Sequence, residues 1–339
     1  MSQLSASAAI DTQTEGAVDT DVLDVEVDRK TSEALREALA EGLSSPYVDA
    51  QRAIPEAVRI FQSHMDPKVL ALLERFVIDP GSVSALHFHG LPIDAELPVT
   101  PVDGLNVAGK STFVSEGVLI GIGRILGHPY AFKDEKQGQL IHQVCPVAKS
   151  ANALSNEGSL ADFKMHVENS FSEHRPHHLL LLCLRGDRDH KAMTRIAAGK
   201  AIASRLSPEH LAVARSPEFR VMCPASFGHR VFSEPLAIFS GPRQFEELRM
   251  DLPEFSEALT DRANATYEAI QALMTEPGVV REVDLQPGQA LVLTNRKISH
   301  GRTVFTPRYD GADRWLQRMY TISDPWPMRG NTDERLRII

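Results

Sequence analysis

The chain has 339 residues, of which 36 are basic and 45 are acidic, so its formal charge is −9. No basic block occurs, which argues against a nucleic-acid or anionic-membrane surface, because both need clustered lysine and arginine. The longest purely apolar run, LLLLCL at 179–184, is far too short to span a membrane, and no signal peptide is visible. The cysteines at 145, 183 and 223 favour neither a disulfide framework nor a cysteine zinc site. We therefore expect a cytoplasmic protein whose partner is a small molecule.

The N-terminal residues 1–27 differ in composition from the rest of the chain. They are small, polar and acidic, and such a segment cannot bury enough apolar surface to order itself alone. We predict a flexible tail there, followed by a single domain over 28–339. From about residue 30 to residue 74, a Ser/Thr cap and apolar residues at helical spacing predict two or three helices. Further helices are expected at roughly 192–204 and 254–275.

Strand-like segments dominate the remainder, and turns that contain proline or glycine separate them. The sequence thus predicts an α+β protein with a strand-rich core wrapped by helices. It shows no repeat at a solenoid period and no glycine-rich loop of the dinucleotide or P-loop type. The strand-like segments are SVSALHFHGLPI, QLIHQVCPV, HHLLLLCLRG, FRVMCPASFG, PLAIFSG, VVREVDLQPGQALVLTN and RWLQRMYTI.

His166 and Glu168 are separated by one residue. In extended backbone this spacing puts both side chains on one face of a strand. Two histidines and one carboxylate on one side of an iron(II) ion leave three positions open, as oxygen activation with a bidentate cosubstrate requires. A second, distant histidine is then needed, and His300 is the candidate because it ends a strand-like run after a QPG turn. So short a pattern also fits a surface strand.

Other histidines are weaker candidates for a metal site. His87 and His89 also share one strand face, but no carboxylate companion is attached to them, so strand packing or surface exposure is the favoured interpretation. His174, His177 and His178 lie at a turn and a strand start, where an Arg-Pro dipeptide interrupts pairing. We expect these three at the surface or in supporting roles.

Two arginines follow His300. Arg314 lies fourteen residues after it and Arg318 four residues further, so both return on the next strand. The planar guanidinium group suits bidentate binding of a carboxylate. Asn295 and Arg296 precede His300, and we expect them to orient its imidazole, because a metal-bound imidazole usually needs a partner for its other nitrogen.

Two long blocks, HVENSFSEHRPHHLLLLCLRGD and HGRTVFTPRYDGADRWLQRMYTISD, resemble the clavaminate synthase-like iron(II)/2-oxoglutarate oxygenases of the TauD/TfdA-like superfamily. Weaker similarity extends from about residue 85 to residue 325. The likeness is to the group that contains asparagine oxygenase and the hydroxylases of free arginine and lysine. It implies a double-stranded β-helix, the jelly-roll core of cupin-like proteins, flanked by helices. It also implies Fe(II) as cofactor, with 2-oxoglutarate and O2 as cosubstrates.

The resemblance assigns roles to individual residues around the iron. His166, Glu168 and His300 would be the iron ligands. Arg314 would bind the distal carboxylate of 2-oxoglutarate, and the hydroxyl of Thr194 would assist it.

The resemblance also implies a site for an amino acid. Arg318 would hold its α-carboxylate, and Glu135 and Asn156 lie where asparagine oxygenase contacts the amino-acid backbone. His142 stands where relatives tend to carry glutamine, which predicts a substrate side chain other than that of arginine.

A lid is expected near residues 233–255. In the arginine and asparagine enzymes, the segment before an LR-x-D stretch carries one or more aspartates that close over the substrate. This chain reads FSGPRQFEELRMDL and has no aspartate before that stretch. Glu246 and Glu247 could supply acid one turn later, or they could be solvated lid carboxylates. The identity of the amino acid therefore stays open.

Together these features predict a hydroxylase of a free L-amino acid that acts at C3 and gives succinate and CO2. Glu168 argues against a radical halogenase, in which a small residue at this position makes room for chloride. Alternatives within enzymes are desaturation, cyclisation, or action on an amino-acid derivative or a carrier-tethered amino acid. A metal-free binding module is the non-enzyme alternative. The family suggests natural-product biosynthesis, and the sequence leaves the oligomeric state open.

Overall fold

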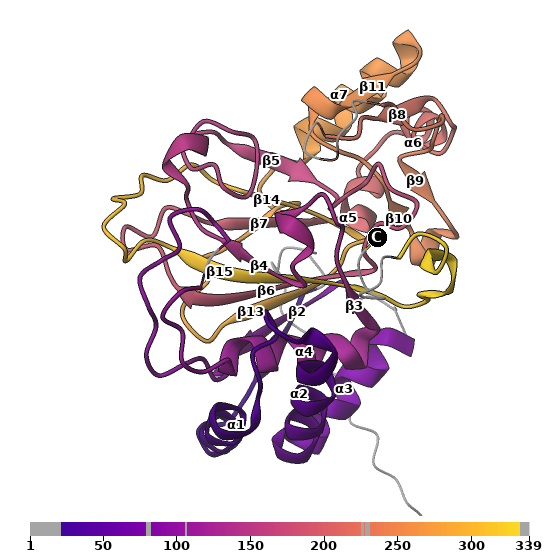
Figure 1. The fold of residues 1–339 in the computed structure, drawn as a ribbon. Coiled ribbons are helices and arrows are strands. Elements are labelled where there is room, and N and C mark those ends of the chain that lie inside the picture. The colour runs from indigo at the N-terminus through magenta and orange to yellow at the C-terminus, as the bar shows by residue number, and fades with distance from the viewer. Residues whose placement is uncertain (1–21, 79–82, 106, 225–226, 228–230, 333–338) are drawn as a thin grey trace, which may run out of the picture.

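The computed structural model describes residues 22–78, 83–105, 107–224, 227, 231–332 and 339. Two facing β-sheets form its centre, and the N-terminal helices cover the outer side of the larger sheet (Figure 1). Within the described residues the two sheets do not close into a barrel. The predicted α+β class, with a strand-rich core wrapped by helices, is confirmed.

Three helices open the domain, as the sequence predicts. They are α1 (Arg29–Gly42), α2 (Ala50–His64) and α3 (Pro67–Ile78). The side chains of Asp28 and Asp49 accept hydrogen bonds from backbone N–H groups in the first turns of α1 and α2. These caps satisfy donors that the start of a helix leaves without an intrahelical partner.

A fourth helix, α4 (Val114–Leu126), was not expected from the sequence. It is buried on nearly every side. Its sequence therefore lacks the separate apolar and polar faces by which an amphipathic helix is recognised. A Cβ atom at Gly121 would collide with the ring of Phe61 in α2, and one at Gly117 with Leu39 in α1. The glycines of α4 therefore allow three helices to approach one another closely.

The larger sheet contains the predicted buried strand β6 (His178–Arg185) near its middle. Its order in the described chain is β1-β2-β13-β6-β15-β3, and β4 also pairs with β15. The other strands are β1 (Val22–Glu26), β2 (Ala85–His89), β3 (His128–Tyr130), β4 (Ile141–Val144), β13 (Ala290–Thr294) and β15 (Trp315–Ile322).

The smaller sheet has the order β12-β7-β14-β5. Side chains such as Leu181 of β6 and Ile298 of β14 belong to one hydrophobic cluster that fills the space between the two sheets. The strands are β5 (Phe163–His166), β7 (Thr194–Ala198), β12 (Arg281–Val283) and β14 (Ile298–Arg302).

Residues 22–26 and 192–204 also differ from the sequence-based expectation. Residues 22–26, at the end of the predicted tail, form β1 and pair in parallel with β2. Val25 is buried there. Pairing with β2 and the burial of this one apolar side chain therefore order a segment whose composition alone predicts disorder. The segment 192–204, expected as a helix, begins as β7 and becomes α5 (Gly199–Ala203) only afterwards, because β12 and β14 pair with it. Residues 1–21 of the predicted tail lie outside the described residues.

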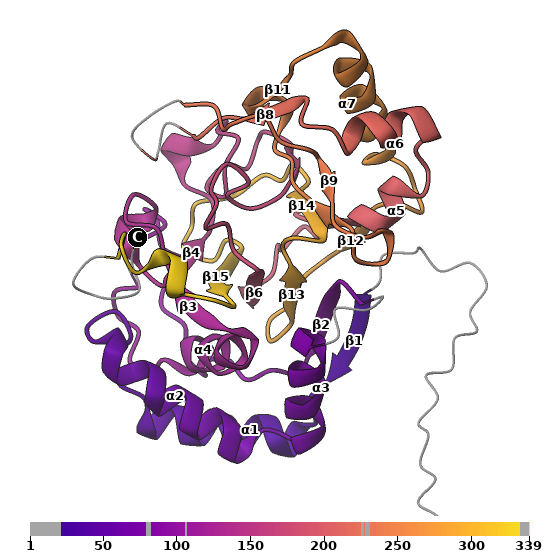
Figure 2. The ribbon, with the colours of Figure 1, turned by 90° about the vertical axis from the view of Figure 1, so that its right-hand side faces the viewer.

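A separate corner of the fold lies beyond the smaller sheet, where α6 and α7 pack together (Figure 2). The predicted helix at 254–275 is helical only within α7, because β11 pairs with β8 before it. The elements are α6 (Pro208–Ala214), α7 (Asp261–Leu273), β8 (Phe219–Val221), β9 (Phe239–Ser240), β10 (Glu247–Leu248) and β11 (Ser256–Ala258).

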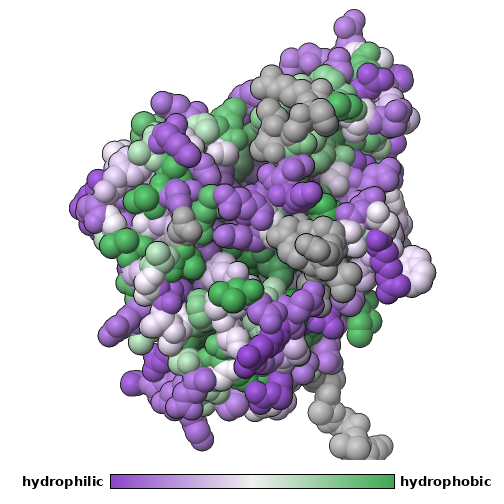
Figure 3. Space-filling model, viewed as in Figure 1, coloured by the Kyte–Doolittle hydropathy of each residue, from purple (hydrophilic) through white to green (hydrophobic). Residues whose placement is uncertain are grey.

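The remaining regular segments are short 3-10 helices. They are η1 (Lys136–Gly138), η2 (Ala148–Ser150), η4 (Arg243–Phe245), η5 (Pro253–Phe255) and η6 (Trp326–Met328). On the face shown in Figure 3, hydrophilic and hydrophobic residues are intermingled. Within the described residues no helix combines the length and the apolar character that crossing a membrane requires.

Candidate active site

His166, Glu168 and His300 come together in the structure. Each is buried, and one potential ligand atom from each lies within 4.8 Å of the other two. The centroids of the two imidazole rings are 4.4 Å apart, and Nε2 of His300 is 3.3 Å from Oε2 of Glu168. The fold therefore groups the three residues that the sequence singles out for a metal.

Strand pairing brings these residues together. His166 ends β5, His300 lies at the middle of β14, and the two are direct partners in an antiparallel ladder. The register of this ladder shifts just after His300. A Cβ atom at Gly301 would lie 2.6 Å from the carbonyl oxygen of Phe163, so glycine is needed for this close approach.

A hydrogen bond at one nitrogen of His166 prepares the other nitrogen for a ligand. Nδ1 lies 2.9 Å from the carbonyl oxygen of Lys164, which can only accept, so Nδ1 holds the hydrogen and Nε2 presents its lone pair. Burial, with His300 beside it, lowers the pKa of His166 to about 4. The ring is therefore neutral at neutral pH, which is the form that binds a metal.

Glu168 is held as a carboxylate by its neighbours. Nη1 of Arg318 lies 3.1 Å from both of its carboxylate oxygens, and the hydroxyl of Tyr320 donates to Oε1 at 3.0 Å. Burial opposes ionisation, but Arg318 and His300 outweigh it and hold the pKa of Glu168 well below its usual range. The cluster thus offers a carboxylate and the neutral imidazole of His166 to a cation, with the ring of His300 beside them.

Asn295 supports Glu168 and does not orient His300, so the sequence-based expectation for this residue is wrong. Its Oδ1 accepts from the backbone N–H of Glu168 at 2.9 Å, and its Nδ2 donates to the carbonyl oxygen of the same residue at 3.0 Å. Arg296 points elsewhere, with Nη1 3.3 Å from Glu247. Among the described residues, Nδ1 of His300 has no hydrogen-bond partner.

Arg318 connects the metal cluster to a second polar group. Its Nη2 donates to Glu135 and, at 2.9 Å, to Nδ1 of His142. The hydroxyl of Tyr320 lies 3.1 Å from each carboxylate oxygen of Glu135. Burial raises the pKa of Glu135, although Arg318 opposes the shift. Burial, with Arg318 beside it, lowers the pKa of His142 well below its usual value, so this ring is neutral.

Two adjoining pockets meet at Glu168 and Arg318, which line both. The outer pocket also contains Asp134, Glu135, Lys136, Asn156, His166, Phe171, Phe227, Asp251 and Phe255 among its lining residues. The inner pocket also contains Val144, Asn156, Phe163, Leu181, Thr194, His300, Gly301, Arg302, Arg314 and Leu316. Every residue that the sequence associated with iron or 2-oxoglutarate lies at one of these pockets.

Arg314 and Thr194 lie side by side in the inner pocket. Nη2 of Arg314 donates to Oγ1 of Thr194 at 3.2 Å, and both residues are buried. The guanidinium lies close to the apolar wall formed by the central strands, where a charge-assisted hydrogen bond is stronger than in water. A carboxylate that entered this pocket would meet a preformed donor pair.

Arg302 is a third arginine of the inner pocket, beside Arg314 and Arg318, and the sequence analysis missed it. The centres of the Phe163 and Phe305 rings lie 5.9 and 5.1 Å from its guanidinium carbon. Among the described residues its Nη2 has no hydrogen-bond partner. Burial, with Arg314 nearby, lowers the pKa of Arg302 to about 9, so it remains a cation at neutral pH. Its position two residues after His300 on the same strand was the signal that could have found it.

The two glutamates of the expected lid lie away from the outer pocket. Glu246 is ion-paired with Arg215. Glu247 lies 3.2 Å from Arg175 and 3.3 Å from Arg296. Neither lines the pocket, and neither is simply solvated, because each has an arginine partner.

Asp251 supplies an acidic side chain to the outer pocket. It is the aspartate of the LRMD stretch, to which the sequence analysis gave no role. Its Oδ2 accepts from the hydroxyl of Ser170 at 2.5 Å, and its Oδ1 accepts from the backbone N–H of Leu252 at 2.8 Å. Burial raises the pKa of Asp251 to about 6, so the group is mostly ionised at neutral pH. Its place directly after the lid strand β10 was the available signal.

The histidines after the metal segment lie outside the metal cluster, as expected. Nδ1 of His177 accepts from the backbone N–H of Ser323 at 2.8 Å. His178 is buried, and its Nδ1 lies 3.2 Å from the hydroxyl of Thr321. A hydrogen-bonded histidine of this kind serves the fold.

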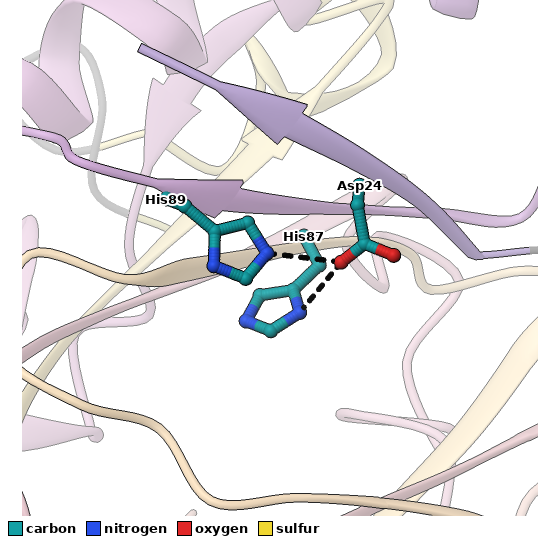
Figure 4. A group of neighbouring side chains, drawn as sticks. All are labelled: Asp24, His87 and His89. Carbon is teal, nitrogen blue, oxygen red and sulfur yellow. Dashed lines mark hydrogen bonds and ion pairs between the residues drawn. The ribbon is translucent and has the colours of Figure 1, made fainter. Parts of the chain in front are cut away.

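His87 and His89 do have a carboxylate companion, so the sequence-based interpretation of this pair needs correction. Oδ1 of Asp24 lies 3.1 Å from Nδ1 of His87 and 2.9 Å from Nε2 of His89 (Figure 4). The carboxylate comes from β1, within the segment that composition assigned to the tail.

Comparisons with known proteins agree with this geometry. The profile of the taurine catabolism dioxygenase TauD, TfdA family matches residues 104–320. The L-asparagine oxygenase of Streptomyces coelicolor is 37% identical over 254 residues, which cover 74% of this chain and 75% of that protein. The L-lysine 3-hydroxylase of Catenulispora acidiphila is 28% identical over 266 residues, or 77% of this chain and 74% of that protein.

A solved structure shows the same fold. Asparagine oxygenase in complex with Fe(II), 2S,3S-3-hydroxyasparagine and succinate is similar, with a TM-score of 0.85 and 32% sequence identity. The match covers 93% of this chain and 98% of that chain. The predicted jelly-roll core flanked by helices is thereby confirmed.

Proposed function

Since the chain belongs to the TauD, TfdA family, whose members and structural neighbours are iron(II)/2-oxoglutarate-dependent oxygenases, we propose that it hydroxylates a free L-amino acid at C3. The reaction consumes 2-oxoglutarate and O2 and gives succinate and CO2. One observation supports this proposal most: the cluster of two histidines and a glutamate lies where an arginine-lined inner pocket meets a polar outer pocket. Two molecules can therefore approach one metal from two sides.

His166, Glu168 and His300 are the proposed iron ligands. They fit iron(II), because the free Nε2 of His166 and the ionised carboxylate of Glu168 are the nitrogen and oxygen donors that this ion accepts. When bound, iron(II) supplies the oxidising chemistry that transfers one oxygen atom from O2 to a C–H bond. Asn295 holds the backbone of Glu168 and so fixes the direction of this ligand.

Arg314 and Thr194 are the proposed anchors of the distal carboxylate of 2-oxoglutarate. Their mutual hydrogen bond leaves the other donors of the guanidinium free to meet a carboxylate as a fork. Arg302 adds another positive charge to the same pocket, which Arg318 also lines. The dianionic cosubstrate is thus attracted by three arginines in a site whose lining contains one carboxylate, Glu168.

A pair of opposite charges in the outer pocket suits the two charged groups of a free amino acid. We assign the α-carboxylate of the substrate to Arg318 and the α-ammonium to Glu135. Asn156 lines the same pocket and can donate to or accept from the amino-acid backbone. His142 acts behind Arg318, because its Nδ1 accepts from the guanidinium and so holds that group in position.

Asp251 is the proposed contact for the substrate side chain. It is a buried acid of the outer pocket outside the metal cluster, and within the described part of the chain each of its carboxylate oxygens accepts one hydrogen bond. A side chain with N–H donors, such as an amide, a guanidinium or an ammonium, would satisfy the remaining acceptor capacity. This assignment replaces the lid glutamates considered from the sequence.

A panel of substrates tests the function directly. The iron-loaded protein is incubated with 2-oxoglutarate and each free L-amino acid, including asparagine, glutamine, histidine, lysine and arginine. We expect one of them to give succinate together with a mass gain of one oxygen, and NMR of the product to place the hydroxyl at C3. A mass loss of two hydrogens would instead indicate desaturation or cyclisation. Absence of turnover with every free amino acid would reject the proposal in favour of a tethered substrate, an amino-acid derivative or a binding module.

Asp251→Asn tests the assignment of the side-chain contact. We expect this variant to raise KM for the amino acid by about tenfold, as the loss of one charge-assisted hydrogen bond predicts, and to leave KM for 2-oxoglutarate unchanged. Glu246→Gln is the matched control, because this lid acid lies away from the pocket. Equal effects of both substitutions on both KM values would contradict the assignment.

The remaining proposals concern the domain organisation, the location and the partners of the protein. We propose that residues 28–339 act as a single oxygenase domain with a lid near 233–255, which supplies Asp251 to the outer pocket. We place the enzyme in the cytoplasm, supported by three cysteines that are all free. Its partner is the amino-acid substrate, and neither nucleic acid nor a membrane is implied.

A further inference from the structure

We propose that Asp24, His87 and His89 form a second metal site, which binds a divalent transition-metal ion such as zinc(II). It lies on the edge strand β1 and on its neighbour β2, outside the two pockets. Among the described residues, this cluster and the proposed iron cluster are the two groups of at least three histidine, cysteine or carboxylate side chains whose potential ligand atoms lie within 4.8 Å of one another. The inference does not depend on the proposed function.

The register of β1 and β2 builds the site. Asp24 and His87 are direct partners in a parallel ladder, and His89 follows two residues later on the same face. Oδ1 of Asp24 lies 3.1 Å from Nδ1 of His87 and 2.9 Å from Nε2 of His89 (Figure 4). Zinc bonds of about 2.0–2.1 Å in tetrahedral geometry separate ligand atoms by roughly 3.3 Å, so a small widening of the cluster accommodates the ion.

His87 is a buried polar side chain with one ring nitrogen that has no partner. It is only 6% exposed, and in the described part of the structure its Nε2 has no hydrogen-bond partner, whereas its Nδ1 has only the 3.1 Å contact with Asp24. Buried polar groups without partners are rare, and each calls for an explanation such as a bound ion.

The neighbours of Asp24 leave its Oδ1 available for a metal ion. Nη2 of Arg281, on β12 of the smaller sheet, lies 3.5 Å from Oδ2 of Asp24, so Oδ1 remains for a single metal bond. The Asp24 side chain is 51% exposed, which gives an ion access from solvent. Two imidazoles and one carboxylate without sulfur suit zinc(II), with water in the fourth position.

The side-chain amide of Gln289 must turn when a metal binds to His89. Its Nε2 now lies 3.0 Å from Nδ1 of His89, while its Oε1 accepts from the backbone N–H of Gln286 at 3.1 Å. A metal on Nε2 of His89 places the ring hydrogen on Nδ1, so the amide must turn its oxygen toward the ring. A carboxylate at this position would accept that hydrogen without turning.

Zinc stoichiometry tests the proposal. The His166→Ala chain, which lacks one iron ligand, is dialysed against about 10 µM zinc(II), and bound metal is measured by mass spectrometry of the dissolved ions. We expect one zinc per chain, and adding Asp24→Asn or His89→Ala should weaken binding at least tenfold. His190→Ala is the matched control, since its Nδ1 lies 2.5 Å from Oδ2 of Asp284 in an exposed pair that belongs to neither cluster.

Gln289→Glu gives a second test that does not remove a ligand. We expect tighter zinc binding in this variant by about tenfold, with the same thermal midpoint as its parent in the absence of zinc. Circular dichroism of each variant without metal verifies the fold. Absence of zinc from the His166→Ala chain, undiminished binding after Asp24→Asn, or no gain from Gln289→Glu would each overturn the proposal.

Discussion

The same arrangement of three side chains occurs twice in the molecule, at the proposed iron cluster and at the edge of the larger sheet. In each case two of the side chains lie two residues apart along the chain, and the third belongs to the direct strand partner of the first. His300 pairs with His166 in an antiparallel ladder, and Asp24 pairs with His87 in a parallel one. Strand register alone thus places three donors together, whichever direction the strands run.

What separates the two clusters is their surroundings. Glu168 is buried beside Arg318 and Tyr320, and two pockets open onto it. Asp24 is half exposed and has Arg281 beside it. A metal at the edge can join strands, whereas a metal at the pockets can also meet a cosubstrate and a substrate. Catalysis therefore depends on the arginines and cavities around the ligands as much as on the ligands themselves.

The largest expected effect follows from removing the charge of Glu168, a proposed iron ligand. Glu168→Gln keeps the shape of the side chain but removes its charge, so we expect kcat/KM for succinate formation to fall by more than about 100-fold, beyond the range seen for residues that only orient ligands. Iron content of the purified variant provides the second measurement. His177→Ala, outside both clusters, is the control. A comparable fall in Asp24→Asn would contradict the division of roles between the clusters.

Arg314→Leu comes next, because it removes a charged donor from the inner pocket and leaves the metal ligands in place. A hydrogen bond to a charged group contributes about 1.5–3 kcal/mol, so KM for 2-oxoglutarate should rise about 10- to 100-fold. Thr194→Val removes only the assisting hydroxyl and should have a smaller effect in the same direction. Steady-state kinetics with varied 2-oxoglutarate measure both. An unchanged KM in Arg314→Leu would reject its role as anchor.

The third prediction concerns the pH dependence of stability that arises from His178, a buried histidine outside both clusters. Burial, with His177 nearby, lowers the pKa of His178 to about 3, so the folded state binds fewer protons than the unfolded state between that value and the ordinary histidine pKa. Stability from this group is complete above the unfolded pKa and is lost as the pH falls. From about pH 7.5 to about pH 5, we expect the free energy of unfolding to fall by about 2 kcal/mol through His178.

Denaturation in urea at several pH values measures this effect. His178→Gln should lower stability overall and flatten its pH dependence over this range, whereas the exposed control His190→Gln should leave the slope nearly unchanged. A slope that survives in His178→Gln would show that other groups produce it.

The smallest effect is expected for Asp24→Asn in the absence of metal. Its contacts with His87, His89 and Arg281 are half exposed, and surface pairs of this kind contribute about 0–1 kcal/mol. The free energy of unfolding of the metal-free protein should therefore change by less than about 1 kcal/mol, measured by urea denaturation. A loss of several kcal/mol would mean that Asp24 serves the fold and not a metal.

Much of the iron site could be predicted because its members lie in long, distinctive segments. The spacing of His166 and Glu168 made them candidates, and the resemblance of two long blocks to the 2-oxoglutarate oxygenases grouped them with His300 and the arginines that follow it. Other residues needed the folded chain. Asn295 bonds the backbone of Glu168, which no spacing reveals, and Asp251 reaches the outer pocket only through the path of the lid.

The fold was predicted to a similar degree. Helices with one apolar face, such as α1 and α2, were recognised, whereas α4 was missed because it is buried on nearly every side and lacks an exposed polar face. The segment that begins at Thr194 has helix-forming residues, but the strands β12 and β14 on either side supply hydrogen bonds that favour a strand. Tertiary context overrode local preference there.

The sequence by itself determined the class of the fold, the iron ligands to test and the arginines for a carboxylate, since periodicity, charge and residue type are local properties. The tertiary structure decided which distant residues share a site. Asp24 is 63 positions from His87 and lies in a segment whose composition predicts no order, yet a single strand pairing places its carboxylate between two imidazoles. Strand register is set by pairing between distant segments of the sheet, so no local sequence pattern reveals it.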